Sequence, residues 1–144
     1  MSSAGTWTRI EGRAVFALAV DLSTRTRFFL GSDGDGIWKR VDRGKTWHYS
    51  GSGAGSDVSA LAVDPRRPTN VYATATGPYP DCVFRSRDGG NTWRVVSSGL
   101  GQSYVGTLAV NPHSPATLYA GGLVGVFKST NAGSSWRRAW PGSR

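Results

Sequence analysis

The stretch SRDGGNTW, residues 86–93, combines an acid, two glycines, a threonine and a tryptophan. Near copies of it are VDRGKTW at residues 41–47 and STNAGSSW at residues 129–136. The acid or amide positions of the three copies, Asp42, Asp88 and Asn131, are 46 and 43 residues apart. A period of that length indicates a repeat architecture, in which each copy is one supersecondary unit.

Three further segments repeat with the same period. The first is LAVD or LAVN, at residues 18–21, 61–64 and 108–111. The second is FFL, VYA or LYA, at residues 28–30, 71–73 and 118–120. The third is IWKR, VFRS or VFKS, at residues 37–40, 83–86 and 126–129. The first segment is a nearly continuous apolar run, which we expect to form a strand buried on both faces. A fourth strand is expected to begin at the motif tryptophan. Units of four short strands at this period are typical of β-propeller blades.

The composition agrees with an all-β chain of 144 residues, because glycine is abundant (20 residues) and Glu11 is the only glutamate. We predict a single propeller-type domain over residues 1–144, with an extra outer strand at 1–10 and blades at 11–50, 51–98 and 99–144. Closed propellers typically have about four to eight blades. We therefore expect a homo-oligomer, a dimer or trimer, to complete the ring, unless the chain is part of a longer propeller.

The repeated motif is predicted to be structural. An Asp at position 88 can accept hydrogen bonds from turn amides, and Asn131 can do the same but cannot act as a carboxylate base. The glycines that share one register suggest a positive φ, and each tryptophan supplies an apolar plate over its blade. The predicted structural set is Asp42, Gly44, Trp47, Asp88, Gly90, Trp93, Asn131, Gly133 and Trp136.

The pattern S-x-D-x-G-x-T-W resembles the Asp-box, or BNR repeat, of sialidase-like β-propellers. Residues 71–93, VYATATG…VFRSRDGGNTW, resemble blades of xyloglucanase-type glycoside hydrolases, sortilin-type receptors and photosystem II assembly factors. The resemblance implies the fold and a structural box away from any active site, but these families differ in activity. The first copy departs from the pattern at Val41, and the third departs at Asn131 and Ala132.

Recognition is expected in the loops that do not repeat, since variable loops on a rigid scaffold commonly carry binding residues. The predicted ligand-binding residues are Tyr79, Tyr104, Asp33 and Asp35. We expect a non-catalytic recognition or scaffold propeller that binds a glycan, a peptide or an acidic surface, with no cofactor.

The alternative is a sialidase- or xyloglucanase-type glycoside hydrolase, or a fragment of one. Such an enzyme needs two carboxylates facing one cleft, and the catalytic candidates for this alternative are Asp33 and Asp81, both in loops between second and third strands. A sialidase-like site would also need a Tyr–Glu pair, and the scarcity of glutamate argues against both enzymes.

The net charge of +8 comes from 17 basic residues that are scattered along the chain, with no run of five. We therefore expect a solvated surface and do not expect nucleic acid as a partner. Neither His48 nor His113 has a partner at metal-ligand spacing, and Cys82 is alone, so no metal site is predicted. No apolar run is long enough to span a membrane, and no signal peptide is visible. A native, complete chain is expected to be cytoplasmic.

Overall fold

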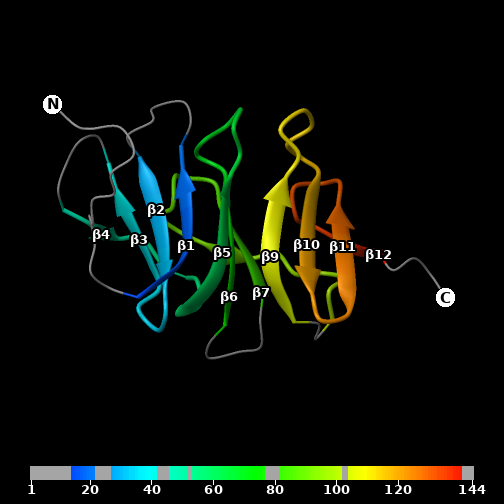
Figure 1. Ribbon diagram of the computed structural model, residues 1–144. Helices are drawn as coiled ribbons and strands as arrows, with labels where there is room; N and C mark the ends of the chain where they lie inside the picture. Colours follow the sequence, from blue (N-terminus) through cyan, green and yellow to red (C-terminus); the bar gives the residue numbers. More distant parts are fainter. Residues whose placement is uncertain are drawn as a thin grey trace, which may run out of the picture.

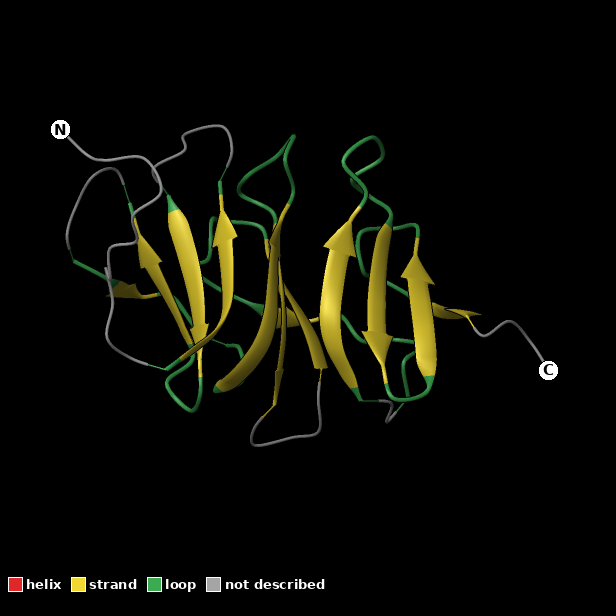
Figure 2. Ribbon diagram, viewed as in Figure 1, coloured by secondary structure: helices red, strands yellow, loops and turns green. Residues whose placement is uncertain are grey.

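The computed structural model describes residues 14–21, 27–41, 46–51, 53–76, 82–101 and 104–140. These residues form three four-stranded antiparallel sheets, blades 1 to 3, whose strands follow chain order (Figures 1 and 2). Blade 1 contains β1 (Val15–Val20), β2 (Phe28–Ser32), β3 (Ile37–Arg40) and β4 (His48–Tyr49). Blade 2 contains β5 (Asp57–Val63), β6 (Val71–Thr76), β7 (Cys82–Ser86) and β8 (Arg94–Val95). Blade 3 contains β9 (Val105–Val110), β10 (Leu118–Gly122), β11 (Gly125–Ser129) and β12 (Arg137–Trp140). The all-β prediction of three four-stranded blades is confirmed.

The blades stand side by side, with their first strands β1, β5 and β9 next to one another (Figure 1). Two hydrophobic clusters fill the two seams between them. Strand β6 contributes side chains to both clusters, because successive side chains of a strand point to opposite faces. Val71 and Ala73 enter the cluster shared with blade 1, whereas Tyr72 enters the cluster shared with blade 3. Blade 2 is therefore covered on both faces.

The first strands are buried to different extents. In β5 every residue after Asp57 is buried or half-buried, as its apolar run predicts. In β1, Phe16 and Leu18 are exposed, and in β9, Thr107 and Ala109 are exposed. Burial on both faces is thus a wrong prediction for β1 and β9. The reason is that one face of blade 1 and one face of blade 3 meet no other blade among the described residues.

Side-chain hydrogen bonds close the turn between the third and fourth strands of blade 2. The Ser86 hydroxyl donates to Asp88 Oδ1 over 2.7 Å and accepts a bond from the Gly90 N–H at 2.8 Å. Asp88 accepts two bonds from Thr92, from its N–H at 2.9 Å and from its hydroxyl at 2.6 Å. The φ of Gly90 is 94°, so the predicted positive φ is confirmed here. The bonds from Thr92 and Ser86 favour the charged carboxylate and lower the pKa of Asp88 from 3.8 to about 2.

The motif tryptophans of blades 2 and 3 join their turns to the preceding blade. Trp93 Nε1 donates to the Ser50 carbonyl over 2.6 Å, and Trp136 Nε1 donates to the Val96 carbonyl over 2.7 Å. Strands β8 and β12 begin one residue after these tryptophans, not at them as predicted. For Trp136 the cause is visible, because its backbone N–H donates to the Ser98 carbonyl over 2.8 Å and is engaged outside the ladder.

Candidate functional site

The predicted loop residues lie on different blades. Asp33 and Asp35 are exposed in the β2–β3 turn of blade 1. Tyr104 is exposed at the start of β9 in blade 3, where it lines a shallow hollow of about 390 Å³ with Thr107 and Val126. Tyr79 and Asp81, like Asp42, Gly44 and the outer strand at 1–10, lie outside the described residues. The structure therefore brings together the two aspartates of one turn, and it sets Tyr104 on another blade.

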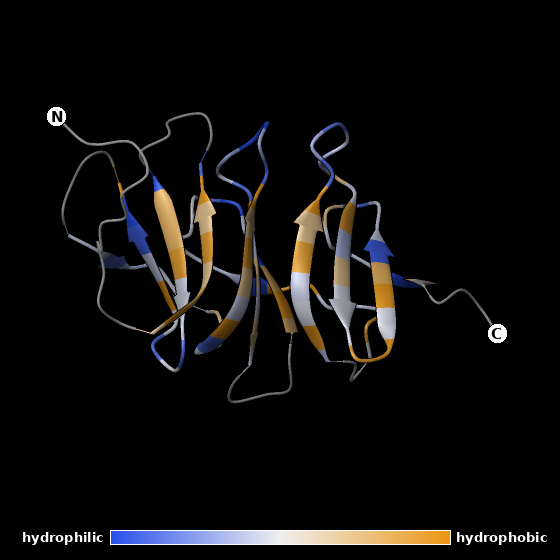
Figure 3. Cartoon of the chain, in the orientation of Figure 1, coloured by the Kyte–Doolittle hydropathy of each residue, from blue (hydrophilic) through white to orange (hydrophobic). Residues whose placement is uncertain are grey.

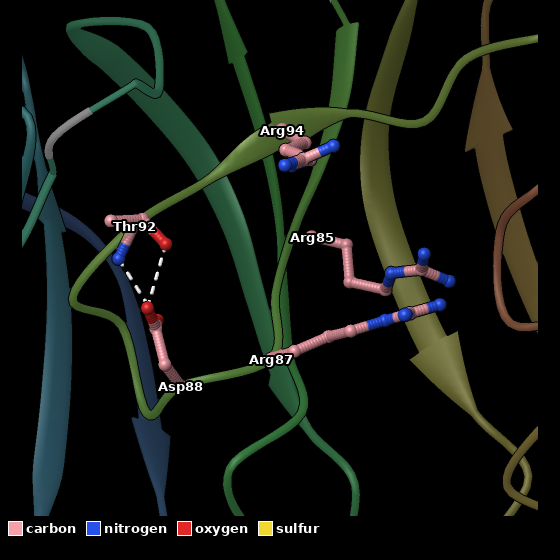
Figure 4. A pocket seen from close by; sticks show the side chains of 5 residues that line it. All are labelled: Arg85, Arg87, Asp88, Thr92 and Arg94. Carbon is pink, nitrogen blue, oxygen red and sulfur yellow. Dashed lines mark hydrogen bonds between the residues drawn. The ribbon is translucent and has the colours of Figure 1, made fainter.

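Three arginines of blade 2 form a site that the loop predictions missed. Arg85 and Arg94 are directly opposite each other in the β7–β8 ladder. Arg87 lies just after the end of β7, and its side chain extends in the same direction as that of Arg85 (Figure 4). Together with Asp88 and Thr92 they line a cleft of about 390 Å³ (Figure 4). Like charges directly opposite on a ladder are destabilising, so this arginine cluster lowers the stability of the fold.

The acidic residue of this cleft does not neutralise the arginines. Asp88 turns toward Thr92, while Arg85 and Arg87 extend in the same direction from the end of β7 (Figure 4). Arg85 Nη1 donates across the seam to the Ala132 carbonyl over 2.6 Å, which fixes one guanidinium group in place. Arg87 and Arg94 form no ion pair with any described residue. Two guanidinium groups therefore keep their hydrogen-bonding capacity for a ligand.

The cleft continues along the seam between blades 2 and 3. A second cleft of about 480 Å³ shares Arg85 and Arg87 with the first and adds Arg67. A third, of about 260 Å³, shares Arg67 and adds Arg66 and Tyr72. We call this continuous surface the seam groove, defined by its five arginines: Arg66, Arg67, Arg85, Arg87 and Arg94. The β5–β6 loop that carries two of them is hydrophilic (Figure 3).

Asp64, the other acid of the seam groove, also serves a local turn. Its Oδ1 accepts bonds from the backbone N–H groups of Arg66 at 2.8 Å and Arg67 at 3.1 Å. None of the five arginines forms an ion pair with another described residue. The groove is therefore electropositive, because its five arginines outnumber its two aspartates, Asp64 and Asp88.

The Tyr72 hydroxyl adds an unused polar group to the seam groove. The residue is fully buried; the Arg85 guanidinium lies near its oxygen, but the O–H donor has no acceptor among the described residues. Burial is the main cause that raises the pKa of the Tyr72 phenol, so the group remains a neutral donor. A buried donor without an acceptor is unfavourable. An oxygen atom of a ligand in the third cleft is the kind of partner that would satisfy it.

The other blades do not carry this arginine cluster. In blade 3, Lys128 and Arg137 occupy the positions of Arg85 and Arg94, Thr130 replaces Arg87, and the corresponding cleft is about 210 Å³. In blade 1, the positions hold Lys39, Val41 and His48. Aligning the repeats could have found this difference from sequence. It was missed because the basic residues look scattered until the strand register shows which of them share a face.

Metal and membrane features are absent from the part of the chain that the structure describes. No group of three or more His, Cys, Asp or Glu residues there is placed to hold a metal ion. The described residues also contain no helix of the length and apolarity needed to cross a membrane.

Comparison with known proteins identifies the architecture. No protein-family model matches the chain. An alignment of 97 positions, which covers 56% of this chain and 9% of the enzyme, is 31% identical to a xyloglucanase of a Paenibacillus species. The GH74 xyloglucanase of Xanthomonas campestris superposes with a TM-score of 0.69 at 22% identity, over 88% of this chain and 21% of that one. YCF48 bound to D1 peptide superposes with a TM-score of 0.66 at 14% identity, over 87% of this chain and 40% of that one. The chain thus spans less than half the length of these proteins, and at these identities the structural likeness establishes the fold: the three sheets are blades of a β-propeller of the kind found in xyloglucanases.

Proposed function

We propose that this chain is a non-catalytic recognition segment of a β-propeller, and that it binds an acidic peptide segment in the seam groove. The observation that carries the proposal is the set of five arginines that line one continuous groove without an ion pair to any described residue. Guanidinium groups bind carboxylates through two parallel hydrogen bonds. An extended peptide with several Asp or Glu side chains matches both the charge and the continuity of this surface.

The lining of the first two clefts favours a peptide over a single-stranded nucleic acid. The first two clefts are lined by Arg, Asp, Thr, Asn and Ala side chains, without an aromatic ring. Single-stranded nucleic acids are bound largely by stacking their bases on aromatic side chains, and that platform is missing here. The likeness to YCF48, whose structure contains a bound peptide, supports a peptide ligand for a propeller of this fold.

The proposal is tested by fluorescence anisotropy with a labelled oligoglutamate peptide and a labelled oligolysine peptide at one fixed salt concentration. We expect binding of oligoglutamate alone. The double variant Arg87→Gln/Arg94→Gln should weaken it by more than about tenfold, because each charge-assisted hydrogen bond contributes about 1.5–3 kcal/mol. Arg85 is left intact, since its bond to Ala132 belongs to the seam.

The matched control is Arg137→Gln/Arg138→Gln, which removes the same charge from exposed positions of blade 3. It should change the affinity by less than about twofold. Equal weakening by both double variants would show a diffuse charge effect and would overturn the site. Tighter binding of a DNA oligomer or a sulfated glycan than of oligoglutamate would overturn the peptide as ligand.

A glycoside hydrolase remains a second candidate because of the 31% identical stretch in a xyloglucanase. The proposed carboxylates are Asp33 and Asp81, and Tyr79, Tyr104 and Asp35 would contact the sugar. The turn motif supports a wider proposal, that the chain is related to Asp-box sialidase-like propellers. Release of reducing ends from xyloglucan, abolished by Asp33→Asn and retained in Asp57→Asn, would favour the enzyme and refute the non-catalytic proposal.

A further inference from the structure

The open face of blade 3 is built like faces that are closed elsewhere in the molecule. The second residue of the second strand is Phe29 in blade 1, Tyr72 in blade 2 and Tyr119 in blade 3. Phe29 and Tyr72 are each 0% exposed, because the next blade covers them, whereas Tyr119 is 36% exposed. The same aromatic position is therefore filled in all three blades, and in blade 3 its cover is missing among the described residues.

A basic side chain next to this aromatic position crosses each closed seam. Lys39 Nζ donates to the Gly89 carbonyl over 2.9 Å, and Arg85 Nη1 donates to the Ala132 carbonyl over 2.6 Å. Both acceptors lie in the turn motif of the following blade. Lys128 holds the same position in blade 3, and its Nζ lies 5.8 Å from the centre of the Tyr119 ring. Among the described residues, no carbonyl of a following blade lies opposite this cation.

The open face of blade 1 shows the converse. Val58 and Val105 are 0% exposed against the preceding blade, but Val15 at the same repeat position is 39% exposed. Leu61 and Leu108 pack into the two seam clusters, but Leu18 is 60% exposed. An apolar strand that is buried in two repeats and exposed in the third marks an interaction surface.

The motif tryptophan of blade 1 also indicates that a further blade packs against this face. Trp93 and Trp136 donate their Nε1–H groups to carbonyls of the blade before them, those of Ser50 and Val96. Trp47 Nε1 is buried and has no hydrogen-bond partner among the described residues. Within the described part of the chain, no carbonyl takes the place of the one that a preceding blade supplies to Trp93 and Trp136.

We propose that these two faces bind each other between two copies of this chain. The blade 3 face (Thr107, Ala109, Tyr119, Val126 and Lys128) receives the blade 1 face (Val15, Leu18 and Trp47) of a second copy. The contact reproduces a seam that the chain already forms twice internally, so shape, apolar packing and hydrogen bonds correspond position by position. Two copies related by a two-fold axis form two such seams and close a ring of six blades, within the usual range. The proposal uses residues other than the seam groove and does not depend on the peptide ligand.

Native mass spectrometry and sedimentation velocity at micromolar concentration provide the first test, with a dimer expected. Leu18→Lys and Tyr119→Asp should each raise the dimer dissociation constant on the order of a hundredfold or more, since each sets an unpaired charge in an apolar seam. Val95→Lys is the matched control, because Val95 is 57% exposed on the outer strand β8, much as Leu18 is on β1. Its dimer should persist.

Mixing the two monomeric variants provides the sharper test. In the mixture, the intact blade 3 face of Leu18→Lys meets the intact blade 1 face of Tyr119→Asp. At the other seam the two changed faces meet, so the introduced lysine of one copy lies near the introduced aspartate of the other. A heterodimer should therefore form where neither variant dimerises alone. A symmetric contact between two blade 3 faces predicts no such rescue. Circular dichroism melting of each variant shows whether its blades are folded.

Three results would overturn the proposal. The first is a folded wild-type monomer at micromolar concentration, which would mean that residues of the same chain or a different protein cover these faces. The second is a dimer that both face variants leave intact. The third is a failure of the mixed variants to associate although each melts like the wild type. A trimer in place of the dimer would keep the contact between faces and refute the six-bladed ring.

Discussion

In the turn of blade 2, Asp88 Oδ1 accepts a bond from the Thr92 N–H at 2.9 Å, and Oδ2 accepts one from the Thr92 hydroxyl. In the turn of blade 3, Asn131 Oδ1 accepts the corresponding bond from the Ser135 N–H, also at 2.9 Å. The second bond is reversed, because Asn131 Nδ2 donates to the Ser135 hydroxyl. The comparison shows that the turn needs an acceptor oxygen at this position and does not need a negative charge.

The two turns differ in charge and in backbone strain. Asp88 is ionised, whereas Asn131 carries no charge at any pH. Gly89 has a φ of 71°, and its counterpart Ala132 has a φ of 58°. A left-handed conformation is unfavourable for a residue with a Cβ atom. Blade 3 thus keeps the turn at the cost of local strain. Three pairs of substitutions and the single substitution Asp88→Asn test how far the two turns are equivalent.

The largest effect is expected from the tryptophans. Trp93→Ala and Trp136→Ala should each lower the free energy of unfolding by about 3–5 kcal/mol, since each removes a buried ring and a bond across a seam. The loss should be larger for Trp93, whose Nε1 contacts two carbonyls, of Ser50 and Gly90. Urea unfolding followed by circular dichroism measures both. If either substitution lowered the unfolding free energy by less than about 1 kcal/mol, the tryptophan would not stabilise the contact between blades as described.

The next effect is expected from the buried serines. Ser86→Ala and Ser129→Ala should each cost about 1–3 kcal/mol, because the N–H of Gly90 or Gly133 would be left buried without its acceptor. The same urea experiment should give values that agree between the two blades. A large cost in blade 2 alone would show that the charge of Asp88 contributes to the network.

The charge of Asp88 predicts a pH effect confined to blade 2. Its pKa is about 2 in the folded chain, below 3.8, so the carboxylate adds stability that is present above about pH 4 and is lost as the pH falls through 2. Asp88→Asn should fold, as Asn131 indicates, and should lack this loss. Unfolding free energies at pH 5, 3 and 2 should therefore converge between variant and wild type. A constant difference across these pH values would mean that the pKa of Asp88 is not lowered.

The smallest effect is expected from the strained alanine. Ala132→Gly should raise the unfolding free energy by about 0.5–1 kcal/mol, by relieving a left-handed conformation. Gly89→Ala is its mirror image and should lower stability by a similar amount, since a Cβ at Gly89 meets no atom within 4 Å. Thermal melts of both variants measure the pair. The two substitutions should change the unfolding free energy in opposite directions. If Ala132→Gly were less stable than the wild type, Ala132 would not be strained.

Much of the fold could be predicted because the repeated segments show where each strand and turn of a blade lies. Three copies of one motif, with strands of period two between them, predict four-stranded blades whatever the ligand. The role of Asp88 followed from Asn131, which performs the same hydrogen bonding without a carboxylate. The location of a site could not be predicted in the same way. Arg85, Arg87 and Arg94 become one cluster only through the register of β7 and β8.

By itself, the sequence determined the number of blades, their strands and the turn that fastens them, since these depend on local hydrogen bonding and alternation. Only the tertiary structure decided which faces are covered. Leu18 and Leu61 both lie in the sequence ALAVD, yet Leu18 is exposed and Leu61 is packed in a seam. The reason is that burial depends on which blade stands beside a strand, and contacts between blades join residues far apart in the chain.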